Sequence, residues 1–174
     1  MKRQGSPPQR RVTWIMVVAA RNKQHPLQLG KSGKRDLRTQ FGVLPYRVVN
    51  GKVQILLITS RETGRWIIPK GWPEAGLSAT ASAAREAWEE AGIEGRISET
   101  CLGLYSYLKA LEDRDRLPVV VAVFPVKVSR LAEKFPEQKA RKRKWFSRKK
   151  AAARVTEPEL RRILRDFDPS LVHL

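Results

Sequence analysis

The stretch PKGWPEAGLSATASAAREAWEEAGI, residues 69–93, decides how this chain folds and what chemistry it can support. Its second half reads as a helix. Ser78 is a preferred N-cap residue, and Gly92 suits the left-handed position that ends many helices. Gly71, at the start of the stretch, lets another group approach the backbone closely. A glycine-containing turn therefore leads directly into a helix.

Three carboxylates lie in this helix. Glu86, Glu89 and Glu90 have i, i+3, i+4 spacing, which places them on one helix face. Their mutual repulsion needs a counter-charge, and Arg85 alone supplies too little. A hard cation such as Mg²⁺ or Mn²⁺ prefers oxygen ligands and would relieve it. The alternative is an ordinary solvent-exposed, glutamate-rich helix.

The same helix carries an apolar face. Ala84, Ala87, Trp88 and Ala91 have helical spacing on a side that neighbours the carboxylates. We expect this face to pack on the core. The carboxylates would then point to solvent or into a cavity.

Apolar runs on both sides of this stretch predict strands. We expect them at residues 41–49, 53–58, 66–68, 97–108, 118–128 and 145–146. Asn50 and Gly51 predict a type I′ hairpin turn between the first two. Pro45 favours an edge strand or a bulge, and Pro125 a bulge or strand end.

Two further helices are expected near the C-terminus. Ser147 would cap one that runs to about residue 155. Thr156 would cap the other, with Pro158 in its first turn and its end near Phe167. Strands mixed with a central and two C-terminal helices predict an α/β or α+β fold with a mixed sheet.

The spacing of the fixed residues resembles a known motif. Gly71 is followed after five residues by Leu77, and after seven more by the run REAWEEAGI, residues 85–93. This resembles the Nudix box, the signature of hydrolases that cleave a nucleoside or other organic diphosphate. Leu77 departs from the pattern, which has glutamate there, so a ligand or loop-anchoring role at that position is in doubt. Glu74 is a candidate replacement.

The resemblance implies an α/β/α sandwich over roughly residues 41–168. We expect residues 1–40 to form a basic N-terminal extension, partly ordered at best, and residues 169–174 a short tail. One domain suits a chain of 174 residues.

The net charge of +18 is uneven along the chain. Residues 1–40 carry +9 and residues 127–154 carry +10, whereas residues 41–126 are neutral and residues 155–174 carry −1. Two basic segments thus flank a neutral centre. They suit a funnel for an anionic small substrate, a solubilising surface or an RNA contact, and charge alone does not separate these.

Composition excludes several classes of function. Cys101 is the one cysteine, so an internal disulfide is excluded, and we expect it in a strand core. With only His25 and His173, histidine-based catalysis is poorly supported. The apolar run 14–20 is too short to span a bilayer and lacks a good cleavage site. We expect a cytoplasmic protein without membrane attachment, as a monomer or homodimer.

The Nudix resemblance also implies roles for the motif residues. Glu86 and Glu90 would be the main ligands of Mg²⁺, with Mn²⁺ as a substitute. Glu89 would share the metal or bind it through water, and the backbone carbonyl at Gly71 would complete the shell. Arg85 would orient a carboxylate by a charge-assisted hydrogen bond.

The proton of the attacking water has more than one candidate acceptor. Glu86 and Glu89 are the main candidates for this role within the family pattern. Glu137, in a later loop, is a further candidate, although a solvated loop charge is the more ordinary explanation. We therefore expect Glu86, Glu89 and Arg85 to act in catalysis.

Segments outside the box resemble the diphosphoinositol polyphosphate phosphohydrolase branch, which also cleaves diadenosine polyphosphates. They are residues 41–46, 60–61, 64–66, 68–71 and 141–146. By position, the substrate phosphates would contact Arg38, Ser60, Arg61, Lys70, Arg114, Arg116 and Arg141. Each could also be an ordinary surface residue. Trp66 and Trp145 are expected in the core rather than as base-stacking platforms.

Three functions compete at this point. The first is a Mg²⁺-dependent enzyme that hydrolyses phosphoanhydrides in a diphosphoinositol polyphosphate or a dinucleoside polyphosphate. The second is an RNA 5′-end pyrophosphohydrolase, whose basic flanks would hold RNA. The third is a non-catalytic nucleic-acid-binding Nudix domain, which the intact Glu86, Glu89 and Glu90 argue against.

Overall fold

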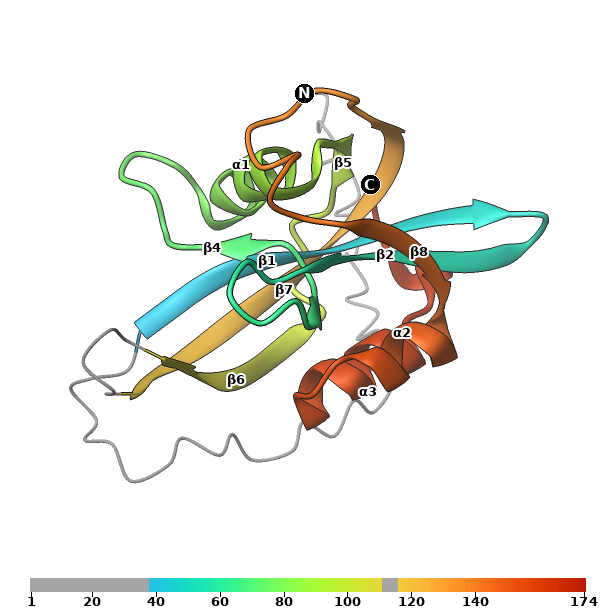
Figure 1. Ribbon diagram of the computed structural model, residues 1–174. Helices are drawn as coiled ribbons and strands as arrows, with labels where there is room; N and C mark the ends of the chain where they lie inside the picture. The colour runs from blue at the N-terminus through green and yellow to red at the C-terminus, as the bar shows by residue number, and fades with distance from the viewer. Residues whose placement is uncertain (1–37, 111–115) are drawn as a thin grey trace, which may run out of the picture.

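The computed structural model describes residues 38–110 and 116–174 (Figure 1). The predicted N-terminal extension and most of the loop around Arg114 therefore lie outside the described residues. The elements in chain order are β1 (Arg38–Val49), β2 (Lys52–Thr59), β3 (Trp66–Ile67), β4 (Lys70–Gly71), α1 (Ala79–Ala91), β5 (Ile93–Ile97), β6 (Gly103–Ala110), β7 (Arg116–Leu131), β8 (Arg143–Ser147), α2 (Arg148–Arg154), α3 (Pro158–Asp166) and a 3₁₀ turn (Pro169–Leu171).

The described strands form one mixed sheet in the order β3-β2-β1-β7-β5. β1 and β7 pair in parallel at its centre, from Arg38 opposite Val119 to Tyr46 opposite Lys127. The other pairs are antiparallel: β4 lies on β1, β6 on β7 and β8 on β2. The predicted mixed sheet is confirmed.

Helices cover both faces of this sheet (Figure 1). Successive residues of a strand point to opposite faces. Val43 and Leu56 accordingly belong to the core under α1, whereas Leu44 and Leu57 belong to the core under α2 and α3. The predicted α/β/α sandwich is therefore confirmed.

The ends of α1 follow the sequence closely. The Ser78 side chain accepts a hydrogen bond from the Ala81 N–H at 3.1 Å, which satisfies one of the free donors at the helix start. Gly92 has φ 60° and ends the helix in the left-handed conformation. Both predicted caps are confirmed.

The buried face of α1 differs from the prediction. Ala83, Ala87 and Ala91 are buried against the sheet, at i, i+4 and i+8. Trp88 is 43% exposed and Ala84 is only partly buried, so their predicted place on the core face was wrong. Small residues let α1 lie close to the sheet, and the indole is turned outward.

Two prolines lie at points where their strand stops pairing with one neighbouring strand and begins pairing with another. Pro45 does not mark an edge, because β1 lies at the centre of the sheet. Its antiparallel register with β4 ends at Gly42 and that with β2 begins at Tyr46, so the missing N–H of Pro45 falls in the gap. Pro125 likewise lies inside β7, between the parts paired with β6 and β5. The Asn50–Gly51 turn is confirmed by positive φ at both residues.

The strand predicted over residues 97–108 is two strands. β5 ends at Ile97 and β6 begins at Gly103, and both pair with the same side of β7. Cys101 lies in the connection between them and is exposed, so its predicted core position was wrong. The imperfect alternation of this stretch predicts one strand, although the polar residues 98–100 lie at the break.

The C-terminal helices are confirmed with one change. Ser147 caps α2, accepting from the Lys150 N–H, and α3 ends at Phe167 as predicted. Thr156 does not cap α3, which begins after Glu157 without a side-chain cap. The Thr156 hydroxyl instead accepts a hydrogen bond from Arg65 at 3.0 Å.

Candidate active site

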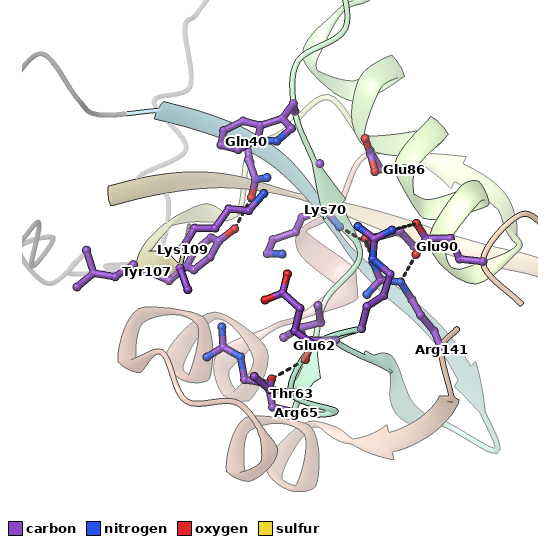
Figure 2. A pocket seen from close by; sticks show the side chains of 18 of the residues that line it. Gln40, Glu62, Thr63, Arg65, Lys70, Glu86, Glu90, Tyr107, Lys109 and Arg141 are labelled. Atoms are coloured by element: carbon purple, nitrogen blue, oxygen red, sulfur yellow. Dashed lines mark hydrogen bonds and ion pairs between the residues drawn. The ribbon is translucent and has the colours of Figure 1, made fainter. Parts of the chain in front are cut away.

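A cavity of about 600 Å³ opens beside the N-terminal half of β1, next to the carboxylate face of α1 (Figure 2). The loop after β2, the β4 segment, β6 and the loop before β8 also contribute to its wall. Its ionisable lining residues are Arg61, Glu62, Arg65, Lys70, Glu86, Glu89, Glu90, Tyr107, Lys109, Arg116, Glu137 and Arg141. Six basic and five acidic side chains therefore face one space.

Glu86 lies directly against the backbone of Gly71. A Cβ added at Gly71 would lie 1.8 Å from the Glu86 carboxyl carbon and 1.9 Å from one of its oxygens. A residue with a side chain at Gly71 would displace this carboxylate. The glycine of the motif is thus required by close approach of Glu86, which brings a carboxylate and the backbone at Gly71 together.

Glu90 is held from both sides. Its Oε2 accepts a hydrogen bond from the Lys70 backbone N–H at 3.0 Å, and its Oε1 forms an ion pair with the Arg141 guanidinium. The Glu90 and Arg141 side chains are only 8% and 5% exposed. Burial raises the pKa of Glu90 to about 7, although Arg141 and the Lys70 N–H act in the opposite direction.

Glu89 belongs to a separate pair at the rim. Arg85 donates from Nε to Glu89 Oε1 at 2.9 Å and also forms an ion pair with Glu74. Arg85 therefore links the loop before α1 to the helix. It is exposed and does not line the cavity.

Glu86 forms no ion pair with a described residue, and burial raises its pKa. The neighbouring charges of Glu89 and Glu137 raise this pKa further, although the positive charges of Lys70 and Arg141 lower it somewhat. A cation bound at this carboxylate would stabilise its negative charge against burial and against repulsion by Glu89 and Glu137. Within residues 38–110 and 116–174, no three His, Cys, Asp or Glu side chains gather closely enough to form a complete metal centre alone.

The donor chemistry nevertheless fits a hard divalent cation. Glu86 offers a carboxylate that forms no ion pair with a described residue, and it lies against the Gly71 backbone. The oxygens of Glu90 each retain a second lone pair beyond the hydrogen bonds that they accept. Backbone carbonyls and carboxylates are the ligands that Mg²⁺ accepts, with water completing its shell.

Lys70 brings a positive charge into the cavity without a counter-ion of its own. Its Nζ lies 5.1 Å from the centroid of the Tyr107 ring. Burial lowers the pKa of Lys70, and Glu90 acts against that change. The Tyr107 hydroxyl donates to Gln40 at 2.8 Å, and burial raises the pKa of Tyr107 to about 12 (Figure 2).

Most of the chain matches the model of a known protein family. The family model of the NUDIX domain matches residues 36–167 of this chain. The chain belongs to the Nudix hydrolase family. The predicted family, and with it an enzyme of the Nudix hydrolase class, is confirmed.

Plant Nudix hydrolases are among its similar relatives. Nudix hydrolase 21 of Arabidopsis thaliana, described as chloroplastic, is 33% identical over 134 residues, covering 75% of this chain and 66% of the relative. Nudix hydrolase 12 of the same plant, described as mitochondrial, is 28% identical over 148 residues, covering 76% and 73%. This chain thus spans about two thirds to three quarters of the length of these plant relatives.

Other similarities are more distant. Diphosphoinositol polyphosphate phosphohydrolase 3-alpha of Mus musculus is 33% identical over 94 residues, about half of each chain (53%). The solved Ap4A hydrolase of C. elegans has a TM-score of 0.54 at 22% identity, covering 74% of this chain and 94% of that one. The latter similarity shows the fold alone.

Most of the predicted Nudix site residues line the cavity, but some do not. Those that line the cavity are Ser60, Arg61, Lys70, Gly71, Glu86, Glu89, Glu90, Arg116, Glu137 and Arg141. Arg38 is exposed at the start of β1 and does not line it, and Arg114 lies outside the described residues. Leu77 is 42% exposed and is likewise not part of the lining.

Sequence reasoning missed several lining residues of this Nudix site. Glu62, Arg65, Trp72, Tyr107 and Lys109 all face the cavity. Glu62 and Trp72 directly follow segments 60–61 and 68–71, and Arg65 lies inside segment 64–66, so the sequence comparison had an available signal for three of them. Nothing in the sequence alone pointed to the inner face of β6, which contributes Tyr107 and Lys109.

Trp66 and Trp145 lie where they were expected. Trp66 packs edge-on against Phe146 with ring centroids 5.1 Å apart, and Trp145 packs against the core under α1. None of the described helices is long and apolar enough to cross a membrane.

Proposed function

We propose that this protein catalyses Mg²⁺-dependent hydrolysis of a phosphoanhydride bond in a polyphosphorylated small molecule. The supporting observation is the Glu86 carboxylate, which lies against Gly71 and forms no ion pair with a described residue, in a cavity that also presents six basic side chains. Mn²⁺ is a chemically suitable substitute. Glu86, Glu90 and the Gly71 carbonyl would hold the metal, with Glu89 beside them.

The chain's own residues account for most of what the reaction needs. A phosphoanhydride resists attack because its negative oxygens repel a nucleophile, so positive charge must be fixed around it. Lys70, Lys109 and Arg116 are positioned to bind phosphate oxygens. The bound metal would add positive charge at the reacting phosphate and lower the pKa of water.

A carboxylate must also receive the proton of the attacking water. Glu86 would be committed to the metal in this scheme, which leaves Glu89 and Glu137 as the acceptors within the cavity. Both are already bound by arginines: Glu89 by Arg85 and Glu137 by Arg141. Each candidate acceptor is therefore held at the cavity by an arginine.

The substrate class rests on the relatives. The mouse relative is named for diphosphoinositol polyphosphates, and the C. elegans structure is an Ap4A hydrolase. We infer that the substrate of this chain is a diphosphoinositol polyphosphate or a dinucleoside polyphosphate.

A matched pair of variants tests this proposal. Glu86→Gln keeps the shape of the side chain but removes its charge, and we expect release of phosphate or nucleotide with Mg²⁺ to fall by roughly 100-fold or more. Glu94→Gln is the control, because Glu94 pairs with Arg130 away from the cavity. Equal activity of Glu86→Gln and the wild type on every substrate turned over would overturn the metal assignment.

RNA 5′-end hydrolysis is the second candidate. Residues 139–154 contain nine basic residues and no acid, and Lys139, Lys142, Lys144, Lys149 and Lys150 are exposed. Binding of a triphosphorylated RNA whose affinity falls steeply with salt would favour it. Equal affinity for the RNA and a free nucleotide triphosphate would exclude an RNA track.

We also propose a cytoplasmic location, although the plant relatives are described as chloroplastic or mitochondrial. Cell fractionation tests this. Light scattering of the purified chain distinguishes the monomer from the homodimer.

A further inference from the structure

One aromatic residue of the cavity has no role in the scheme above. Trp72 lines the cavity and is 38% exposed. It directly follows Gly71, so its Cα lies about 3.8 Å from that of the glycine. A ring bound on this indole would therefore lie next to the Glu86 and Gly71 end of the cavity.

Lys109 makes a cation–π contact with the Trp72 indole. Its Nζ lies 5.0 Å from the centroid of the Trp72 ring, within cation–π range. Lys109 belongs to β6 and Trp72 to the segment after β4, so the contact joins two walls of the cavity. The contact places a positive charge beside an aromatic surface, which suits a ligand with both phosphate and a flat ring.

The other large aromatic residues do not offer such a surface. Trp66 packs within the core, and neither Trp145 nor the exposed Trp88 lines the cavity. Tyr107 does line it, but its ring is partly buried against the core and stacks on Tyr105, and its hydroxyl is bonded to Gln40. Among the described residues, Trp72 is the one indole that faces the substrate space.

The number of basic side chains left unpaired in the cavity limits how many substrate phosphates it can bind. Three of its six basic side chains are engaged by glutamates: Arg61 by Glu137, Arg65 by Glu157 and Arg141 by Glu90. The remaining three, Lys70, Lys109 and Arg116, form no ion pair with a described residue.

The lining also includes five glutamates. One of them, Glu62, faces the cavity beside Lys70 (Figure 2) and forms no ion pair with a described residue. A fully phosphorylated inositol ring has no flat apolar face that could stack on the indole. Its negative charge also exceeds what the three unpaired basic side chains, Lys70, Lys109 and Arg116, could balance. A nucleotide has a flat base and fewer phosphates.

We propose that Trp72, braced by Lys109, is a stacking subsite for a nucleobase and directs the enzyme to nucleotide-containing diphosphates. This inference rests on the proposed hydrolase function and assigns the organic part of its substrate. Base–aromatic stacking tolerates any base, so the subsite selects the presence of a base rather than its identity. Phosphates of the same ligand reach Lys109, Lys70 and Arg116.

Binding of two matched ligands tests the subsite. One is a methylene-bridged, non-hydrolysable analogue of diadenosine tetraphosphate, and the other is a methylene-bridged inorganic tetraphosphate, which lacks the bases. Calorimetry with Mg²⁺ gives both Kd values for the wild type, Trp72→Ala and Trp72→Phe. Thermal melts establish that the variants are folded, which is expected because Trp72 is partly exposed.

We expect the wild type to bind the analogue more tightly than the base-free ligand. Trp72→Ala should raise the Kd of the analogue roughly tenfold, within a range of about five- to 150-fold, and that of the base-free ligand less than about twofold. Trp72→Phe should recover most of the affinity, since a smaller ring still stacks.

Several outcomes overturn the subsite. They are equal weakening of both ligands by Trp72→Ala, no weakening of either, and a wild type that does not bind the analogue more tightly. The proposed hydrolase is judged separately, by Glu86→Gln. Glu86-dependent turnover of diphosphoinositol pentakisphosphate with no effect of Trp72→Ala would keep the hydrolase and remove the base subsite.

Discussion

Gly71→Ala is the substitution whose effect the structure specifies most directly. The new methyl carbon would lie 1.8 Å from the Glu86 carboxyl carbon, whereas ordinary contact begins at 3.4 Å. The carboxylate must therefore retreat by about 1.6 Å, the difference between the two distances. The backbone at Gly71 does not have the positive φ that would make alanine itself strained.

The expected effect is a large loss of activity with a small loss of stability. Misplacement of a reacting group by about 1 Å can cost roughly 100-fold in rate, so we expect kcat/KM to fall at least that far. Glu86 is only partly buried, and its side chain can rotate away at little cost. A destabilisation near 1 kcal/mol corresponds to a decrease in Tm of about 2–4 °C for a chain of this size.

Three measurements check this reasoning. They are steady-state hydrolysis, the Kd for Mn²⁺ by calorimetry, which should rise about tenfold or more, and a thermal melt. Gly51→Ala is the control: it strains the hairpin turn, because Gly51 has φ 70°, but its new methyl carbon would contact nothing within 4 Å. If Gly71→Ala keeps activity and Mn²⁺ affinity within threefold of the wild type, the seat of Glu86 on Gly71 is not functional.

Three further predictions concern charges around the cavity. Arg141→Met leaves Glu90 buried without its ion pair, so the free energy of unfolding, measured by urea denaturation, should fall by about 3 kcal/mol. Arg130→Met is the control, because it breaks an exposed ion pair and should change this free energy by less than about 1 kcal/mol. Burial raises the pKa of Glu90 from 4.5 to about 7, so the folded protein retains a proton that the unfolded chain releases. The free energy of unfolding in metal-free buffer should therefore fall as pH rises from about 4.5 to 7. Glu90→Gln should flatten this slope. Glu157→Gln removes the ion pair that engages Arg65 at 3.2 Å, so Arg65 becomes free to bind substrate phosphate. KM should fall about fivefold with kcat unchanged, equivalent to roughly 1 kcal/mol, and a KM that rises would contradict this.

The sequence determined the parts of the fold that depend on local rules. The cap at Ser78, the left-handed end at Gly92 and the turn at Asn50–Gly51 each follow from what one or two residues can do with their own backbone. The helix with three carboxylates was visible for the same reason, because its spacing is short.

What failed depended on contacts between distant segments. Pro45 lies in a central strand because β4 and β2 occupy different parts of the same side of β1, and no local pattern encodes that arrangement. Trp88 is exposed because the close approach of α1 to the sheet favours Ala83 and Ala87. Periodicity identified the helix and the buried positions of Ala87 and Ala91, but it put Trp88 on the core face and missed Ala83.

The candidate site shows the same division. The motif residues of α1 were predictable, whereas Trp72 and Lys109 meet only because β6 folds back along β7. Arg141 was predicted to bind substrate phosphate, yet its guanidinium is engaged by Glu90 and Glu137. The side chain of a basic residue cannot be assigned to substrate from its charge, because partners far away in sequence compete for it.

The departure at Leu77 becomes understandable through such contacts. The family pattern has a glutamate there, but Leu77 is exposed and no described contact requires a charge from it. Glu74, three residues earlier on the same loop, pairs with Arg85, and Arg85 in turn donates to Glu89 at 2.9 Å. The Glu74 N–H also donates to the Ser82 hydroxyl at 3.3 Å, which ties the loop to the first turns of α1. A carboxylate on this loop thus pairs with the motif arginine, and Glu74 stays the candidate replacement for the glutamate of the family pattern.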